Sequence, residues 1–137
     1  MYEKEKRFLE EVGTSDLGHS GRTLLDHLFG TADILIKYNR PPEEVKAGMF
    51  HSIYGTDLYR SAKDLDIDRQ SVIDIIGEEA EELAHQFCIL APRTEKIING
   101  LVAEKYIDSL RWIEYANIKE QNPHSRNLIP LRVLLGI

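Results

Sequence analysis

Apolar residues recur at intervals of three and four positions along most of the chain, which is the spacing of one face of an α-helix. The pattern predicts helices over residues 3–12, 23–38, 42–54, 68–76, 78–90 and 94–118. The alternation of apolar and polar residues that is typical of a half-buried strand is nearly absent from the sequence. We therefore expect an all-α fold in which residues 1–137 form a single compact bundle of about five to seven helices.

Glycine and proline residues set the expected ends of these helices. Gly13 follows the first helix, where a C-terminal glycine is common. The third helix is expected to start after Pro41 and Pro42, because proline suits a first helical turn, and to end at Gly55. In the 94–118 segment the helical pattern continues through Gly100, so we expect that glycine inside the helix. An interruption near residues 105–109 is the place where this helix would divide.

Two histidines lie on helical faces that are expected to meet. The buried stripe of the 23–38 helix is predicted to be Leu24, Leu28, Thr31, Leu35 and Tyr38. His27 lies beside this stripe. His51 shares a face of the next helix with Ala47 and Gly48, whose small side chains allow a close approach or leave room for a bound group. Because a short polar turn joins the two helices, they are expected to pack antiparallel, with His27 and His51 facing each other.

Three more polar residues near this hairpin are candidates for the same site. His19 lies between two glycines just before the helix, and it is either a ligand or substrate contact or an ordinary surface residue. Arg22 has a charge that the start of a helix disfavours, which suggests that it binds an anion or pairs with Asp26. Tyr54 has a phenol that can donate a proton or stabilise an oxyanion.

The other histidines and the single cysteine are expected to lie outside the site. His85 falls at the edge of an apolar helical face, where a surface ion pair with Glu81 is the commoner outcome and a ligand role the rarer one. His124, in a polar loop beside a proline, is expected to be solvated. Cys88 is expected to be a small buried hydrophobic residue, since no basic group lies near it in the sequence.

The segments HSGRTLLDHLFGT (residues 19–31) and GMFHSIYGTD (residues 48–57) resemble a small uncharacterised family of HD-like proteins with HSGR, HL-GT and FHSIYGT motifs. The similarity covers roughly residues 19–90. In the HD superfamily, a histidine on one helix and a following His-Asp pair bind a metal, which implies that His27 and His51 are ligands. Ser52 stands where that aspartate would be. A carboxylate that would bridge two metal ions is thus missing, and a mononuclear centre fits this sequence better.

The leading hypothesis is a metal-dependent small-molecule enzyme of HD-like type, because related HD proteins include phosphohydrolases and di-iron oxygenases. The candidate metal ligands are His27 and His51, joined by His19 or by an acid such as Asp57 or Asp26. Imidazole pairs suit iron, zinc or manganese, and a site with two or three protein ligands leaves open positions for water or substrate. Hydrolase or oxygenase chemistry is then expected.

Two alternatives use the same residues without a metal. In the first, the candidate catalytic residues His27, His51, Tyr54 and Arg22 act as acid, base and anion anchor in a lyase or isomerase. In the second, the protein is a non-catalytic HD-like module that binds a small molecule or a partner. The two histidines are then core residues whose hydrogen bonds are satisfied inside the protein.

Composition and charge narrow the expected partners. The chain has 17 basic and 23 acidic residues, a net charge of −6, which argues against a nucleic-acid partner and a polybasic contact with a membrane. We find no apolar run that could span a bilayer and no signal-peptide pattern, so a cytoplasmic protein with a small-molecule substrate is expected. Arg22 and Arg93 would suit an anionic substrate. The apolar segment 128–137 is expected to close the core or to form a homodimer.

Overall fold

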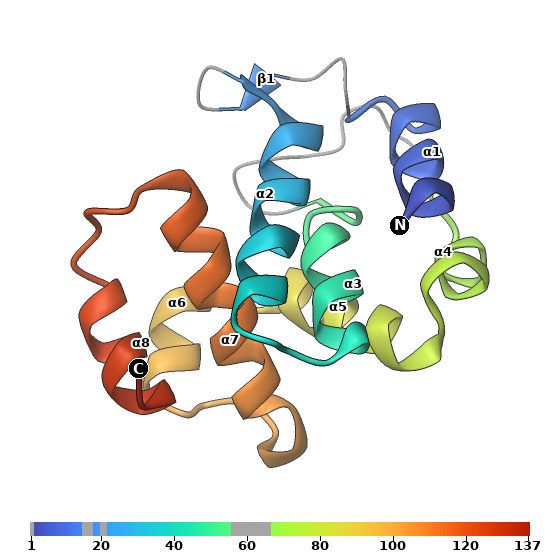
Figure 1. The fold of residues 1–137 in the computed structure, drawn as a ribbon. Coiled ribbons are helices and arrows are strands. Elements are labelled where there is room, and N and C mark those ends of the chain that lie inside the picture. Colours follow the sequence, from blue (N-terminus) through green and yellow to red (C-terminus); the bar gives the residue numbers. More distant parts are fainter. Residues whose placement is uncertain (1, 15–17, 20–21, 56–66) are drawn as a thin grey trace.

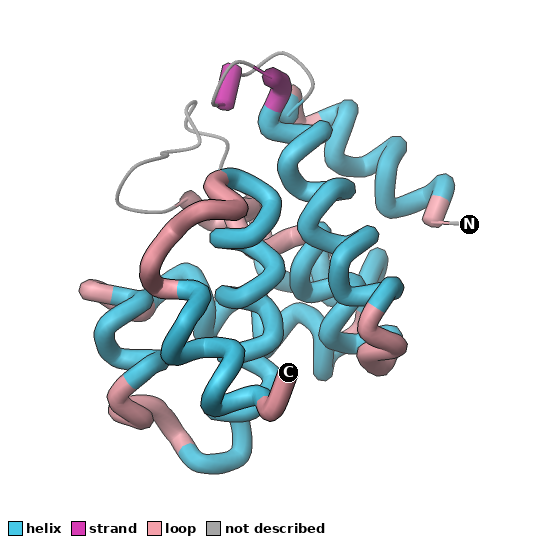
Figure 2. Tube along the Cα trace, turned by 60° about the vertical axis from the view of Figure 1, so that its left-hand side comes forward, coloured by secondary structure: helices cyan, strands magenta, loops and turns pink. Residues whose placement is uncertain are grey.

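Helices make up most of the structure, a computed structural model that describes residues 2–14, 18–19, 22–55 and 67–137 (Figure 1). These residues contain eight helices and one two-stranded antiparallel hairpin, which confirms the all-α prediction. The helices are α1 (Glu3–Glu11), α2 (Leu24–Lys37), α3 (Pro42–Met49), α4 (Arg69–Ile76), α5 (Glu78–Ile89), α6 (Arg93–Ile98), α7 (Glu104–Gln121) and α8 (Leu128–Leu135). The hairpin pairs β1 (Gly18–His19) with β2 (Arg22–Thr23) just before α2 (Figure 2).

The first turns of α2 and α3 are fixed by local chemistry. The Thr23 hydroxyl accepts the Asp26 backbone N–H at 3.1 Å, and the Asp26 carboxylate accepts the Thr23 N–H at 3.4 Å. This reciprocal pair is a capping box, which satisfies two N–H groups that have no partner within the helix. In α3, Pro42 occupies the first helical position. Both predicted helix starts are confirmed, and Asp26 serves as a cap.

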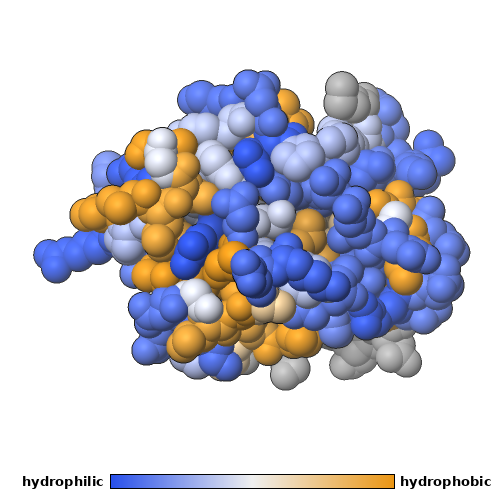
Figure 3. Space-filling view, turned by 90° about the horizontal axis from the view of Figure 1, so that it is seen from below, coloured by the Kyte–Doolittle hydropathy of each residue, from blue (hydrophilic) through white to orange (hydrophobic). Residues whose placement is uncertain are grey.

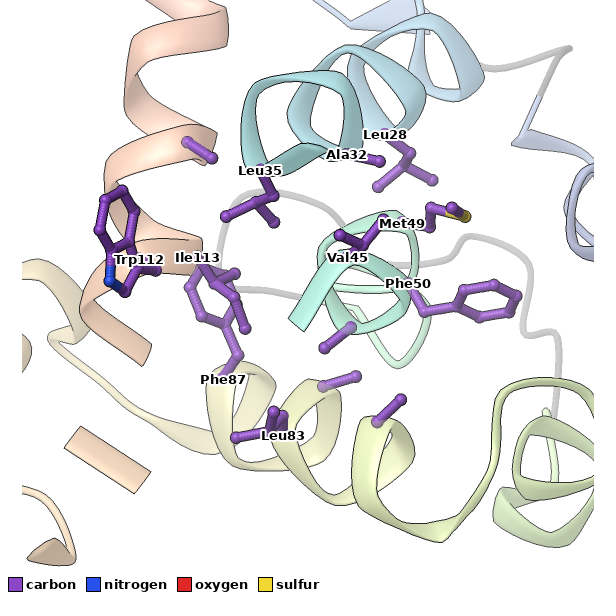
Figure 4. Close-up of a cluster of buried hydrophobic side chains, with 14 of the residues drawn as sticks. Leu28, Ala32, Leu35, Val45, Met49, Phe50, Leu83, Phe87, Trp112 and Ile113 are labelled. Atoms are coloured by element: carbon purple, nitrogen blue, oxygen red, sulfur yellow. The ribbon is translucent and has the colours of Figure 1, made fainter. Parts of the chain in front are cut away.

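The hydrophobic core lies where α2, α3, α5 and α7 meet (Figure 4). In this view α3 lies between α2 and α5, and α7 closes one side. The labelled core residues are Leu28, Ala32, Leu35, Val45, Met49, Phe50, Leu83, Phe87, Trp112 and Ile113. The predicted stripe of α2 is buried except at its last position. Tyr38 is 37% exposed, and its hydroxyl lies 3.3 Å from that of Tyr115.

Gly48 allows α3 to pack closely on α2. A Cβ atom at this position would lie 2.6 Å from the Leu35 Cδ1 atom, which is closer than real side chains approach. The side chain of Thr31, one turn before Leu35, would also be in contact with it, at 3.6 Å. The absence of a side chain at Gly48 therefore allows the close packing of α3 on α2. His27 lies on α2, and His51 lies on the turn after α3.

Two predicted helices differ from those in the structure. The helix that begins at Pro42 ends at Met49 rather than near Gly55, and turns follow it, so His51 lies on a turn. The predicted 94–118 helix is two helices, which separate at Gly100 and not near residues 105–109. Gly100 has φ +74°, and the N–H groups of Gly100 and Leu101 bond back to Ile97 and Lys96. This pattern is a Schellman motif, which ends a helix.

The apolar C-terminal segment closes part of the core and also faces outward. In α8, Leu128 and Leu131 are buried, whereas Ile129 is 62% and Val133 75% exposed. Apolar residues gather in the left part of Figure 3, on the side where α8 lies in Figure 1. The homodimer expected from this segment stays a prediction. Within the described ranges, no helix combines the length and the apolar character that crossing a membrane requires.

Candidate functional site

His27 points into the protein from the first turn of α2, on the buried face of this helix. Its side chain is 1% exposed, and its ring meets the ring of His51 edge-on, with the ring centres 5.1 Å apart. The two Nε2 atoms are 3.2 Å apart. The predicted meeting of the two imidazoles is thus confirmed.

His51 is held by the turn that follows α3. Its Nδ1–H donates to the Gly48 carbonyl at 2.6 Å, so the Nε2 atom carries the lone pair that faces His27. The backbone carbonyl of His51 accepts the Cys88 thiol from α5 at 3.0 Å. The Phe87 ring packs edge-on against the imidazole, with the ring centres 5.3 Å apart. These contacts from α3 and α5 fix both the position and the tautomer of His51.

A third polar side chain, from α7, completes what we call the histidine cluster: His27, His51, Asn117, Glu114 and Glu120. The Asn117 Oδ1 atom lies 2.8 Å from His27 Nε2. The amide is oriented by its other end, because Nδ2 donates to Glu114 Oε1 at 3.0 Å. Glu114 is fully buried and also accepts the Thr94 hydroxyl.

Glu120 completes the outer part of the histidine cluster. Its Oε1 atom lies 2.5 Å from His27 Nδ1, and its Oε2 atom lies 2.5 Å from an Arg22 guanidinium nitrogen. Arg22 therefore borders the histidine cluster at its exposed edge, where it pairs with Glu120 and not with Asp26. Because a carboxylate only accepts hydrogen bonds, His27 Nδ1 must carry a proton that it donates to Glu120.

When His27 is neutral, three hydrogen-bond acceptors therefore converge at the centre of the cluster, whereas a second proton on its ring would make Nε2 the donor to His51 and Asn117. The N–H groups of His27, His51 and Asn117 all point outward, to Glu120, the Gly48 carbonyl and Glu114. The atoms that face inward are the two Nε2 nitrogens and one amide oxygen. Such atoms repel each other unless a positive charge lies between them, and either a proton on one nitrogen or a metal ion supplies it.

Part of this arrangement resembles a metal site. Ligand atoms about 2.1 Å from one ion, at angles near 90–110°, are about 3.0–3.4 Å from each other. The Nε2 pair, at 3.2 Å, falls in this range, whereas Asn117 Oδ1 and His27 Nε2, at 2.8 Å, are at hydrogen-bond distance. Metal-bound histidines usually donate their second N–H to a carboxylate or a backbone carbonyl, as His27 and His51 both do. The described residues contain no group of three or more His, Cys, Asp or Glu side chains that could hold a metal.

The other predicted site residues have different outcomes. The side chain of His19 and the whole of Asp57 lie outside the described residues. Tyr54 is directed away from the histidine cluster, and its hydroxyl donates to Glu81 at 2.7 Å. Of the candidate catalytic residues, the structure thus brings together His27, His51 and Arg22 but not Tyr54.

Tyr54 belongs to a second network, the Glu81 cluster, in which the buried Glu81 carboxylate binds the half-buried Tyr54 and the exposed Arg69. Arg69 makes two hydrogen bonds to the Glu81 carboxylate, at 2.7 and 2.8 Å. Burial alone would raise the pKa of Glu81, but the bonds from Arg69 and Tyr54 together lower the pKa below its ordinary value. Burial, and then the bond to Glu81, raise the pKa of the Tyr54 phenol well above its usual range. Tyr54 is therefore a weaker acid than an ordinary tyrosine, although its hydroxyl donates a hydrogen bond to Glu81.

His85 and His124 lie outside the histidine cluster, as the sequence predicts. His124 is exposed. His85 is half-buried against the ring of Tyr54, and the surface ion pair expected with Glu81 is not formed, because Glu81 is buried and bound by Arg69 and Tyr54. Burial raises the pKa of the Cys88 thiol to about 11, so this side chain is a neutral donor to the backbone and a weak nucleophile.

Asn117, Glu114 and Glu120 were not predicted as site residues, because Glu114 and Asn117 look like ordinary polar positions of the predicted 94–118 helix and Glu120 lies just beyond it. In the structure α7 continues to Gln121. Leu110, Ile113, Asn117 and Glu120 follow each other at intervals of three and four residues. A polar continuation of an apolar stripe was therefore the available signal, and it indicates a buried polar site at the end of a helix.

The chain belongs to a family whose description is a domain of unknown function (DUF6817), and the family model matches residues 8–93. This range includes His27, His51 and Arg22 and ends before α7, which supplies Asn117 and both glutamates of the histidine cluster. No curated protein and no solved structure matches the chain.

Proposed function

We propose that this protein is a metal-dependent enzyme of HD-like type that acts on a small molecule. The observation that carries the proposal is the convergence of three acceptor atoms, from His27, His51 and Asn117, each oriented by a hydrogen bond on its far side. Neutral imidazole and amide ligands suit a divalent transition metal such as iron, zinc or manganese.

The residues of the cluster divide the work. His27 Nε2, His51 Nε2 and Asn117 Oδ1 would hold the metal, while Glu120 and Glu114 keep these ligands in place. A metal in such a site acidifies water or polarises a substrate oxygen, which is the chemistry of hydrolases, or activates oxygen. With three protein ligands, further positions remain for water and substrate. Because Ser52 replaces the aspartate of a His-Asp pair, a single metal ion is proposed.

The charges around the cluster favour an anionic substrate. Both carboxylates have an arginine beside them: Arg22 pairs with Glu120 at 2.5 Å, and Arg93 Nε lies 3.5 Å from Glu114. The three proposed ligands are neutral, so the charge of a divalent ion there would not be cancelled by its ligands. An anionic oxygen would supply the missing charge.

Metal analysis of tag-free protein tests the proposal directly. We expect the wild type to carry or take up a single metal ion per chain, and the His27→Ala and His51→Ala variants to lose it. His124→Ala is the matched control, because it removes an exposed histidine from the loop after α7 and leaves every residue of the cluster in place. Folded wild-type protein that neither retains metal nor binds added zinc, manganese or ferrous ion would overturn the proposal.

A metal-free acid–base enzyme, a lyase or isomerase, is the second candidate. It is favoured by the continuous chain from Glu120 through His27 to His51, in which a proton on His27 Nε2 would satisfy the facing acceptors. A carboxylate that orients a histidine is a common arrangement for a general base. Full activity in rigorously metal-free protein would favour this candidate over the first.

A further inference from the structure

Glu120 reaches His27 by lying across a helical position that has no side chain. Gly30, on α2, is three residues after His27, and a Cβ atom there would lie 2.6 Å from Glu120 Oε2 and 2.8 Å from its Cγ. The three nearest atoms to that position all belong to Glu120. Glycine is unfavourable inside a helix, by about 1 kcal/mol relative to alanine. Its presence here provides the space that the Glu120 carboxylate occupies.

The position of Glu120 decides which nitrogen of His27 faces the cluster. Nδ1 donates to Glu120, so the lone pair of a neutral ring is on Nε2, toward His51 and Asn117. Arg22 binds the second carboxylate oxygen and keeps the carboxylate in this orientation. Without Glu120, the ring could carry its proton on Nε2, and its lone pair would then point away from the other two acceptors.

We infer that Glu120 is a positioning residue, which, in the space left by Gly30, holds His27 with its Nε2 lone pair directed at His51 and Asn117. The inference deepens the proposed function, because the same orientation makes His27 a metal ligand. It assigns a role to a residue outside the range that the family model matches. It also gives a physical reason for Gly30, which a helical pattern alone does not explain.

The test combines Glu120→Ala, Glu120→Gln, Gly30→Ala and the double variant Gly30→Ala/Glu120→Ala. The tautomer of His27 is measured by nitrogen-15 NMR of the imidazole in metal-free protein, and zinc affinity is measured separately. We expect Glu120→Ala and Gly30→Ala each to reduce the Nδ1–H population and to weaken zinc binding 10- to 100-fold. The double variant should bind zinc no more weakly than Glu120→Ala, because alanine at position 30 acts only by displacing Glu120.

Two variants separate positioning from general damage to the fold. Glu120→Gln keeps an acceptor for Nδ1–H, so it should retain the tautomer and restore part of the zinc affinity. Asp33→Ala removes an exposed acid from α2, the helix that carries His27 and Gly30, and should change neither the tautomer nor the zinc affinity. An unchanged tautomer in Glu120→Ala, or an unchanged zinc affinity in that variant when the wild type binds zinc, would overturn the inference. A tautomer that depends on Glu120 in a wild-type protein that binds no metal would support the positioning role while it overturned the proposed metal site.

Discussion

The histidine cluster and the Glu81 cluster are both built on buried carboxylates, but they differ in what faces their centres. In the Glu81 cluster, donors of Arg69 and Tyr54 converge on the Glu81 carboxylate. In the histidine cluster, the carboxylates lie on the outside and draw the N–H groups outward. The negative charge of Glu81 is therefore balanced by Arg69 within its own cluster. The lone pairs at the centre of the histidine cluster are balanced only when a proton or a metal ion lies between them.

On the proposed function, this difference separates a structural network from a metal-binding site. A buried carboxylate that receives several hydrogen bonds is stable without any other group, and it fastens the elements that supply the donors. Glu81, on α5, fastens Tyr54 and Arg69, which lie on either side of residues 56–66 in the sequence. Three acceptor atoms that face one another do not hold their helices together unless a proton or a metal ion lies between them. The comparison therefore predicts that variants of the Glu81 cluster change stability, and that variants of the histidine cluster change binding.

The largest effect on stability is expected from Glu81→Ala. Removing the carboxylate leaves the Tyr54 hydroxyl and Arg69 without their shared acceptor, which should cost about 3 kcal/mol of unfolding free energy. Glu82→Ala is the matched control, because Glu82 also binds Arg69 but is partly exposed, and its loss should cost less than ~0.5 kcal/mol. Urea unfolding measures both. Equal costs for the two variants would contradict the structural role assigned to Glu81.

Metal addition should stabilise the wild type and leave His51→Ala unaffected. A ligand that binds only the folded state stabilises it by about 2.7 kcal/mol at a hundredfold excess over its Kd. Thermal unfolding in the presence of zinc or manganese measures this gain. Glu81→Ala should gain as much as the wild type, because its loss lies outside the histidine cluster. A gain that vanished in Glu81→Ala would show that the two clusters are not separate.

Acid should weaken the Glu81 cluster in a way that identifies its carboxylate. The pKa of Glu81 is lowered in the folded state, so its contribution is complete above the ordinary carboxyl pKa near 4.5 and is lost as the pH falls below that value. The stability difference between the wild type and Glu81→Gln should therefore shrink between pH 7 and pH 3. Denaturant unfolding at several pH values measures it, and a constant difference would argue against the lowered pKa.

The helices were largely predictable from the sequence because their signals are local. The starts of α2 and α3 follow from Thr23 and Pro42, residues that act on their own helical turn. The approach of His27 and His51 followed from helical spacing and a short connection. The end of α3 at Met49 and the division at Gly100 were missed, since a helical pattern can continue through residues that tertiary packing removes from a helix.

The rest of the site was not predictable because it is held by contacts over long sequence separations. Asn117 and Glu120 meet His27 from a helix ninety or more residues away along the chain. The need for glycine at position 30 becomes clear only from the structure, in which the Glu120 side chain packs against it. Tyr54 was predicted as a site residue because its phenol lies near His51 in the sequence, yet its hydroxyl donates to a buried acceptor on α5 instead.

Cys88 lies between the two clusters and gives the smallest predicted effect. Its thiol donates to the carbonyl of His51, and both Arg93 and Glu81 influence its pKa. Cys88→Ala removes this donor and should cost about 1 kcal/mol of stability, whereas Cys88→Ser keeps a donor and should cost less. If the bond also holds the turn that carries His51, Cys88→Ala should weaken zinc binding several-fold and Cys88→Ser should restore it. Calorimetric titration with zinc measures this, and equal affinities in all three proteins would limit Cys88 to packing.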